Sequence, residues 1–146
     1  MAQFKRLNHT MALSAQITVT DVEEAARDGF RHIINNRPDG EESGQPKGRT
    51  IEAAAKAAGL GYTAIPVKPG GLDESALVAM TEALQQAEGP ILAYCRTGTR
   101  SAFLWALSTA ALGESEPDVI FAEAANAGYD LTPIMPMVDN LAKTHK

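Results

Sequence analysis

Short apolar runs alternate along the chain with longer segments in which apolar residues recur every three or four positions. Side chains repeat every two residues along a strand and about every 3.6 along a helix, so the runs predict strands and the longer segments helices. The expected strands are 11–14, 30–35, 61–67 and 91–94, and the expected helices are 20–29, 50–58, 74–86, 101–112, 118–126 and 132–143. This alternation predicts a single α/β domain over residues 1–146, with a four- or five-stranded, mostly parallel sheet flanked by helices.

Polar residues predict where several helices begin. Thr20 and Glu23 have the spacing of a capping box. Asp73 suits the N-cap of helix 74–86, and Ser101 suits that of helix 101–112. The segment 37–48 is rich in Gly, Pro and charged residues, which predicts a long loop whose Glu41 and Glu42 form a solvent-exposed charge run.

Composition excludes several function classes. Of the 146 residues, 45% are hydrophobic and 21% charged, which is typical of a globular chain and not of a disordered one. The net charge of −5 argues against nonspecific nucleic-acid binding, and no apolar run approaches the ~18 residues of a membrane span. We therefore expect a cytoplasmic protein. The low density of charge also allows a homodimer.

From the positions of the cysteine and the histidines, we expect neither a bound metal ion nor a cofactor. Cys95 is the only cysteine, so an internal disulfide and a cysteine-based zinc site are excluded. The three histidines are scattered along the sequence: His9, His32 and His145.

Residues 95–101 (CRTGTRS) carry the strongest chemical signal, because they lie directly between an apolar strand and an apolar helix. Backbone N–H groups of a tight loop that leads into a helix form a cradle for an anion, and the helix N-terminus adds positive charge. Arg100 adds a guanidinium that can bind two oxygens. The same donors would stabilise the thiolate of Cys95, which is its nucleophilic form.

The remaining candidates surround this loop. Gly98 suits a backbone with positive φ. The expected substrate-binding residues are Arg96, Thr97, Gly98, Thr99, Ser101 and, from the long loop, Arg37 as a second contact to the oxyanion. Trp105 is expected in the core.

Cys-x-x-Gly-x-Arg-Ser after an apolar strand resembles the active loops of cysteine-dependent phosphatases and of rhodanese sulfurtransferases. The wider chain, through INNRPDGE (34–41), QP (45–46) and AGLGYTAIPV (58–67), is similar to the beta-lactamase-hydrolase-like family and its phosphatase-like domain. The resemblance implies a dual-specificity-phosphatase-like fold and hydrolase activity, and some relatives are associated with sulfide and persulfide metabolism.

Two reactions on a small anionic substrate remain open. In the first, Cys95 attacks a phosphoester held by Arg100, a phosphocysteine forms, and the resemblance implies a carboxylic acid for the leaving alcohol, for which Asp73 is the nearest candidate. In the second, Cys95 carries a persulfide. The resemblance over the whole chain favours the first reaction. The second is favoured by Tyr94 at the position where the phosphatase pattern has His, by a loop one residue shorter than in that pattern, and by Lys68 and Pro69 at the position where the pattern has its acidic residue. A third hypothesis is an anion-binding or redox-sensing module without turnover.

Overall fold

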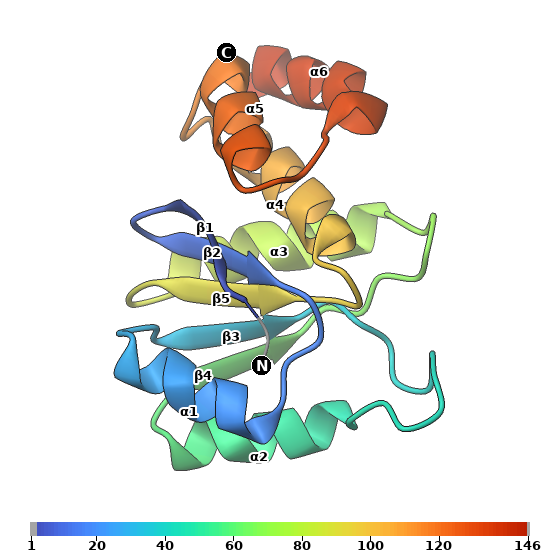
Figure 1. Ribbon diagram of the computed structural model, residues 1–146. Coiled ribbons are helices and arrows are strands. Elements are labelled where there is room, and N and C mark those ends of the chain that lie inside the picture. Colours follow the sequence, from blue (N-terminus) through green and yellow to red (C-terminus); the bar gives the residue numbers. More distant parts are fainter. Residues whose placement is uncertain (1–2, 146) are drawn as a thin grey trace.

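A five-stranded sheet forms the centre of the molecule (Figure 1). The computed structural model describes residues 3–145. The strand order is β1 (Lys5–Asn8), β2 (Met11–Ser14), β5 (Ile91–Tyr94), β3 (His32–Asn35) and β4 (Gly61–Ala64). Strand β1 is antiparallel to β2, and the other neighbours are parallel, which confirms the predicted mostly parallel sheet. Strand β4 ends earlier than predicted, before Pro66, which has no N–H to continue the ladder.

Helices cover both faces of the sheet (Figure 1). The helices are α1 (Val19–Arg27), α2 (Gly48–Ala57), α3 (Glu74–Gln86), α4 (Thr99–Leu112), α5 (Pro117–Asn126), the 3-10 turn η1 (Thr132–Ile134) and α6 (Met135–His145). Figure 1 shows α1 and α2 on one side, and α3 and α4 on the other, with α5 and α6 stacked beyond α4. The prediction of a single α/β domain is confirmed.

Alternation along the strands divides the core into two clusters. Leu13, Ile34 and Ala93 pack with α3 and α4, whereas their chain neighbours Ala12, Ile33 and Leu92 pack with α1 and α2. Helix α4 lies between the sheet and the outer helices, so it is buried on nearly every side, as its apolar sequence predicts. Trp105 on this helix is 3% exposed, which confirms its expected place in the core.

Three helix starts differ from the predictions. The capping box of α1 is formed by Thr18 and Asp21, so its assignment to Thr20 and Glu23 was wrong. Ser101 was wrongly predicted as an N-cap, because α4 already begins after Gly98. Helix α2 starts at Gly48, earlier than the predicted Thr50, and the Gly48 N–H donates to Asp39 Oδ1 at 2.8 Å, although the N-cap residue Lys47 makes no side-chain capping bond.

The parallel strands place three connections at one end of the sheet. Segments 36–47, 65–73 and 95–98 follow β3, β4 and β5, and Figure 1 shows them at the same edge. The carboxyl edge of a parallel sheet is where such folds usually bind ligands. Within residues 3–145, every helix is too short or too polar to span a lipid bilayer.

Candidate active site

Cys95 lies at the carboxyl end of β5, below the loop that opens α4. Its side chain is fully buried, and its Sγ accepts a hydrogen bond from the Gly98 N–H at 3.1 Å. Gly98 has φ +97°, a conformation that an L-residue rarely adopts. The thiol therefore lies at the positive end of a helix and accepts a hydrogen bond from a backbone N–H.

Arg100 is held beside Cys95 by groups from two other connections. Its Nη1 donates to Glu41 Oε2 at 2.7 Å and to the Val67 carbonyl at 2.6 Å, and its Nη2 donates to Glu41 Oε1 at 2.9 Å. The hydrogen bond with Glu41 raises the pKa of Arg100, and the electrostatic interaction with the neighbouring Cys95 side chain raises it further. The guanidinium therefore lies beside the Cys95 side chain, while a carboxylate and a carbonyl fix its orientation.

Glu41 is one of the residues of this site that the sequence interpretation missed. Besides Arg100, its carboxylate pairs with Arg37 Nε at 2.9 Å, and its side chain is 16% exposed. The hydrogen bonds from Arg100 and, to a smaller extent, Arg37 lower the pKa of Glu41 to about 2. Its interpretation as a solvent-exposed charge was wrong, because its partner Arg100 lies far along the chain.

Arg37 is buried and its donors are engaged within the site. It contacts Glu41, Glu42 Oε1 at 2.7 Å and Gln16 Oε1 at 3.1 Å. Arg37 and Arg100 thus both donate to Glu41 Oε1. Its direct contact with an oxyanion stays a prediction.

Ser101 links α4 to the end of β3 from inside the protein. Its buried hydroxyl donates to Asn36 Oδ1 at 2.8 Å, and Asn36 Nδ2 donates to the Ile65 carbonyl at 3.0 Å. Asn36 therefore connects all three segments that border the site. It is a structural residue of the site that the sequence interpretation did not single out.

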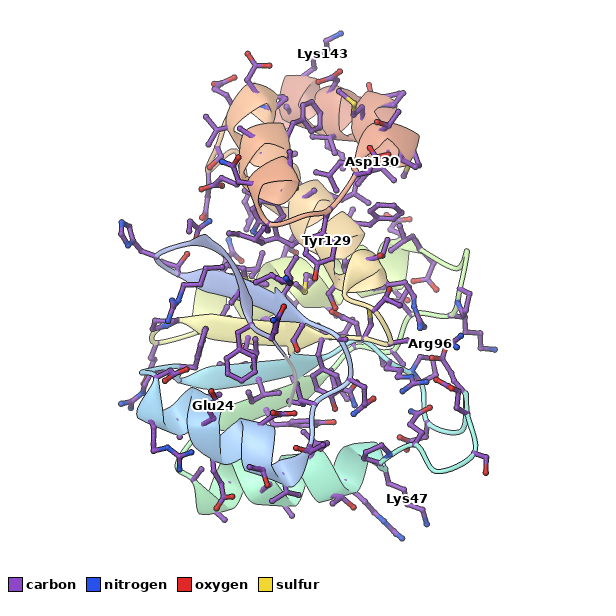
Figure 2. The ribbon with its side chains drawn as sticks, viewed as in Figure 1. Glu24, Lys47, Arg96, Tyr129, Asp130 and Lys143 are labelled. Carbon is purple, nitrogen blue, oxygen red and sulfur yellow. The ribbon has the colours of Figure 1, made fainter. Side chains whose placement is uncertain are left out.

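Arg96, Thr97 and Thr99 form the exposed rim of the loop. Arg96 Nε lies 3.0 Å from Glu42 Oε1, and Figure 2 shows Arg96 beyond the end of the sheet. The hydroxyls of Thr97 and Thr99 are hydrogen-bonded to each other at 3.2 Å. These side chains are accessible to a substrate that approaches from solvent.

Asp73 is the N-cap of α3, as its sequence position predicts. Its Oδ1 accepts from the Ala76 N–H at 2.8 Å and from the Ser75 hydroxyl at 2.9 Å. These two bonds lower the pKa of Asp73. A general acid needs the opposite shift, so the capping contacts disfavour the acid role predicted for it.

The loop that carries Cys95 and Arg100 lies between the central parallel strand β5 and the buried helix α4. Together with the five-stranded sheet, this arrangement defines a phosphatase-like domain of the protein-tyrosine-phosphatase fold. Residues 3–112 match the family described as "Beta-lactamase hydrolase-like protein, phosphatase-like domain", and the chain belongs to this family. The resemblance inferred from the sequence is thereby confirmed.

The relatives and solved structures agree with this assignment. Beta-lactamase hydrolase-like proteins of Xylella fastidiosa (strain Temecula1) and Agrobacterium fabrum (strain C58) are 38% and 36% identical over 125 and 126 residues, which cover 86% of this chain. The chain corresponds to only 29% of the length of each. A candidate phosphatase of Neisseria meningitidis Z2491 superposes with a TM-score of 0.80 at 36% identity, over 93% of this chain and 96% of that one.

Two more distant structures share the fold. PTPMT1 has a TM-score of 0.70 at 18% identity and covers 97% of this chain and 95% of its own. Pseudomonas aeruginosa TpbA, crystallised with phosphotyrosine, has a TM-score of 0.65 at 18% identity and covers 98% and 94%.

Proposed function

We propose that this domain is a cysteine-dependent phosphatase in which Cys95 is the nucleophile. The observation that carries the proposal is the donor arrangement around its sulfur: the Gly98 N–H at 3.1 Å, the start of α4, and Arg100 beside it. Donors that stabilise a thiolate also suit the oxygens of a phosphoryl group bound in front of it.

The proposed reaction has two steps. The thiolate of Cys95 attacks phosphorus as the P–O bond to the leaving group breaks, and a phosphocysteine forms. Water then attacks that phosphorus, which releases inorganic phosphate and restores the thiolate. Arg100 and the loop N–H groups bind the non-bridging oxygens in both steps, where positioned charge stabilises the transition state.

The other site residues support this geometry in different ways. Gly98 supplies the N–H that faces sulfur. Arg96, Thr97 and Thr99 line the exposed approach to the loop, and Ser101 holds the base of α4 through Asn36. Arg37 and Glu41 fix Arg100, so that its orientation exists before a substrate binds.

We expect the substrate to be a small phosphoester. The structure of TpbA with phosphotyrosine supports an aromatic phosphoester as a first probe, because that protein shares this fold. The exposed rim of the loop also favours a substrate whose phosphate enters from solvent.

A sulfurtransferase is the second candidate, and the length of the loop favours it. Only four residues separate Cys95 from Arg100, one fewer than in the phosphatase pattern, and a single sulfane sulfur needs less space than a phosphoryl group. In that reaction Cys95 would take sulfur from thiosulfate and pass it to a thiol or cyanide.

A side-by-side assay of the purified domain distinguishes the two. p-Nitrophenyl phosphate and thiosulfate with cyanide are tested on the wild type, on Cys95→Ser and on Thr144→Ser, a control on α6. The proposal expects phosphate release by the wild type and Thr144→Ser, and none by Cys95→Ser. Phosphate release that persists without Cys95 would overturn it, and thiocyanate formation without phosphate release would favour sulfur transfer.

A further inference from the structure

Tyr129 brings a phenol hydroxyl into the Cys95 loop from a segment that is distant in sequence. It follows α5, and a Cβ atom placed on Gly98 would collide with its Oη. Gly98 is the residue whose N–H faces the Cys95 sulfur. Figure 2 shows Tyr129 on the connection between α5 and η1, beside α4. The hydroxyl therefore lies against Gly98, in the loop whose backbone donates to the Cys95 sulfur.

The backbone on both sides of Tyr129 is fixed. The Tyr129 N–H donates to the Ala124 carbonyl at 2.9 Å, which closes the end of α5. Next to it, Asp130 Oδ1 accepts from the Thr132 N–H at 2.9 Å and holds the start of η1. A side chain on such a turn is positioned by the fold, as a reacting group needs to be.

The hydroxyl of Tyr129 is free to donate. Within residues 3–145, the Tyr129 hydroxyl takes part in no hydrogen bond, although the ring is half-buried. Burial raises the pKa of Tyr129, and the electrostatic interaction with Cys95 raises it further. The phenol is therefore protonated at neutral pH, and its proton is available next to Gly98 of the Cys95 loop.

We infer that Tyr129 is the proton donor to the leaving group of the Cys95 reaction. The inference rests on the proposed phosphatase function and adds a catalytic residue to it. It also supplies a proton donor that the segment after β4 lacks, because the nearest carboxylate there, Asp73, is engaged in capping α3.

The step is balanced in protons and electrons. As the sulfur–phosphorus bond forms and the P–O bond breaks, the electron pair of that bond stays on the leaving oxygen, which takes the proton of Tyr129 Oη. The phenolate that remains accepts a proton from the water that hydrolyses the phosphocysteine. The cycle thus returns the phenol, with water and the phosphoester as the only reactants.

Leaving-group dependence tests this role, because a proton donor matters most when the leaving anion is a strong base. We would measure kcat/KM of the wild type, Tyr129→Phe and Tyr62→Phe for p-nitrophenyl phosphate and for phenyl phosphate. Tyr62 is the matched control, since it is also half-buried but packs against α2 on the other face of the sheet. Thermal unfolding of each variant verifies that it is folded.

The expected result is a loss of about 10²-fold or more for Tyr129→Phe on phenyl phosphate, with little change on p-nitrophenyl phosphate and no change for Tyr62→Phe. An equal loss of Tyr129→Phe on both substrates, or no loss on either, would overturn the inference while the phosphatase function stands. Absence of Cys95-dependent phosphate release in the wild type would instead overturn the proposed function, and the role of Tyr129 with it.

Discussion

At the scale of single residues, the orientation of Arg100 is set from outside its own loop. Glu41 binds both terminal nitrogens of the guanidinium, and the Val67 carbonyl binds one of them. Arg37 holds Glu41 in turn. The arginine that would bind substrate is thus oriented by a carboxylate from the connection after β3.

Replacing Glu41 tests this positioning. We expect Glu41→Gln to lower kcat/KM for an aryl phosphate by roughly 10²-fold, because Arg100 loses its charged partner and its fixed geometry. Glu52→Gln removes a carboxylate from an exposed pair with Lys56 and is the control, with unchanged kinetics. A lower KM in Glu41→Gln would contradict the account, since it would mean that Glu41 competes with the substrate for Arg100.

Gly98 needs both a positive φ and space for a neighbouring side chain, whereas Gly59 needs only the positive φ and is therefore a control. Gly98 and Gly59 both have positive φ, but only at Gly98 would a Cβ atom meet another side chain, that of Tyr129. We expect Gly98→Ala and Gly59→Ala each to lower the free energy of unfolding by about 1–2 kcal/mol. Only Gly98→Ala should abolish turnover. Urea unfolding and an aryl phosphate assay check both, and full activity of Gly98→Ala would argue against a close-fitting loop.

At the scale of elements, side-chain hydrogen bonds stabilise the starts of α1, α2 and α3, and the acceptor for α2 lies nine residues before Gly48 in the sequence. The type of cap was predictable where the capping residue is local in sequence. Asp73 caps α3 as expected, and α1 does begin with a capping box, but the box is formed by Thr18 and Asp21 instead of Thr20 and Glu23. The acceptor for α2, Asp39, lies across a loop, which no local pattern indicates. Helix α3 therefore offers the clearest test of a cap against a catalytic acid.

Asp73→Asn separates these two roles, because Asn and Asp are similarly effective N-caps but only Asp can donate a carboxyl proton. We expect Asp73→Asn to keep both the thermal midpoint and kcat/KM, and Asp73→Ala to lower the midpoint alone. The measurement is differential scanning calorimetry with a parallel phosphatase assay. A strong loss of turnover in a stable Asp73→Asn would assign the acid to Asp73.

The sequence predicted the elements better than it predicted the contacts of the site. The apolar run before Cys95 and the apolar helix after it define a buried strand and a buried helix, and the structure contains both. Glu41 and Tyr129 were not found, since each reaches the loop through the fold from a distant segment. Sequence spacing reports neighbours along a helix or strand, and these two contacts exist only after the sheet and helices assemble.

At the scale of the whole molecule, the parallel sheet brings the segments after β3, β4 and β5 to one edge. An ion-pair network of Arg37, Glu41, Glu42, Arg96 and Arg100 joins two of these segments. The site is therefore part of the tertiary structure, and its charge state should affect global stability.

The pH dependence of unfolding tests this link. The pKa of Glu41 is about 2 in the folded protein, below its ordinary value of 4.5. The ionised Glu41 therefore stabilises the folded state fully at pH values above 4.5. This stabilisation is lost as the pH falls through about 4 towards about 2. We expect urea unfolding to show a loss of stability over this range that is smaller in Glu41→Gln. Identical slopes for the two proteins would contradict a stabilising role for the network.

The most direct test of the account is to detect the covalent intermediate. The wild-type domain and Cys95→Ser would be mixed with an aryl phosphate, quenched rapidly in acid and analysed by peptide mass spectrometry. The account predicts a phosphoryl group on the Cys95 peptide of the wild type and none on the same peptide of Cys95→Ser. Turnover of the aryl phosphate with no phosphoryl group on Cys95, or with one on a different residue, would contradict it.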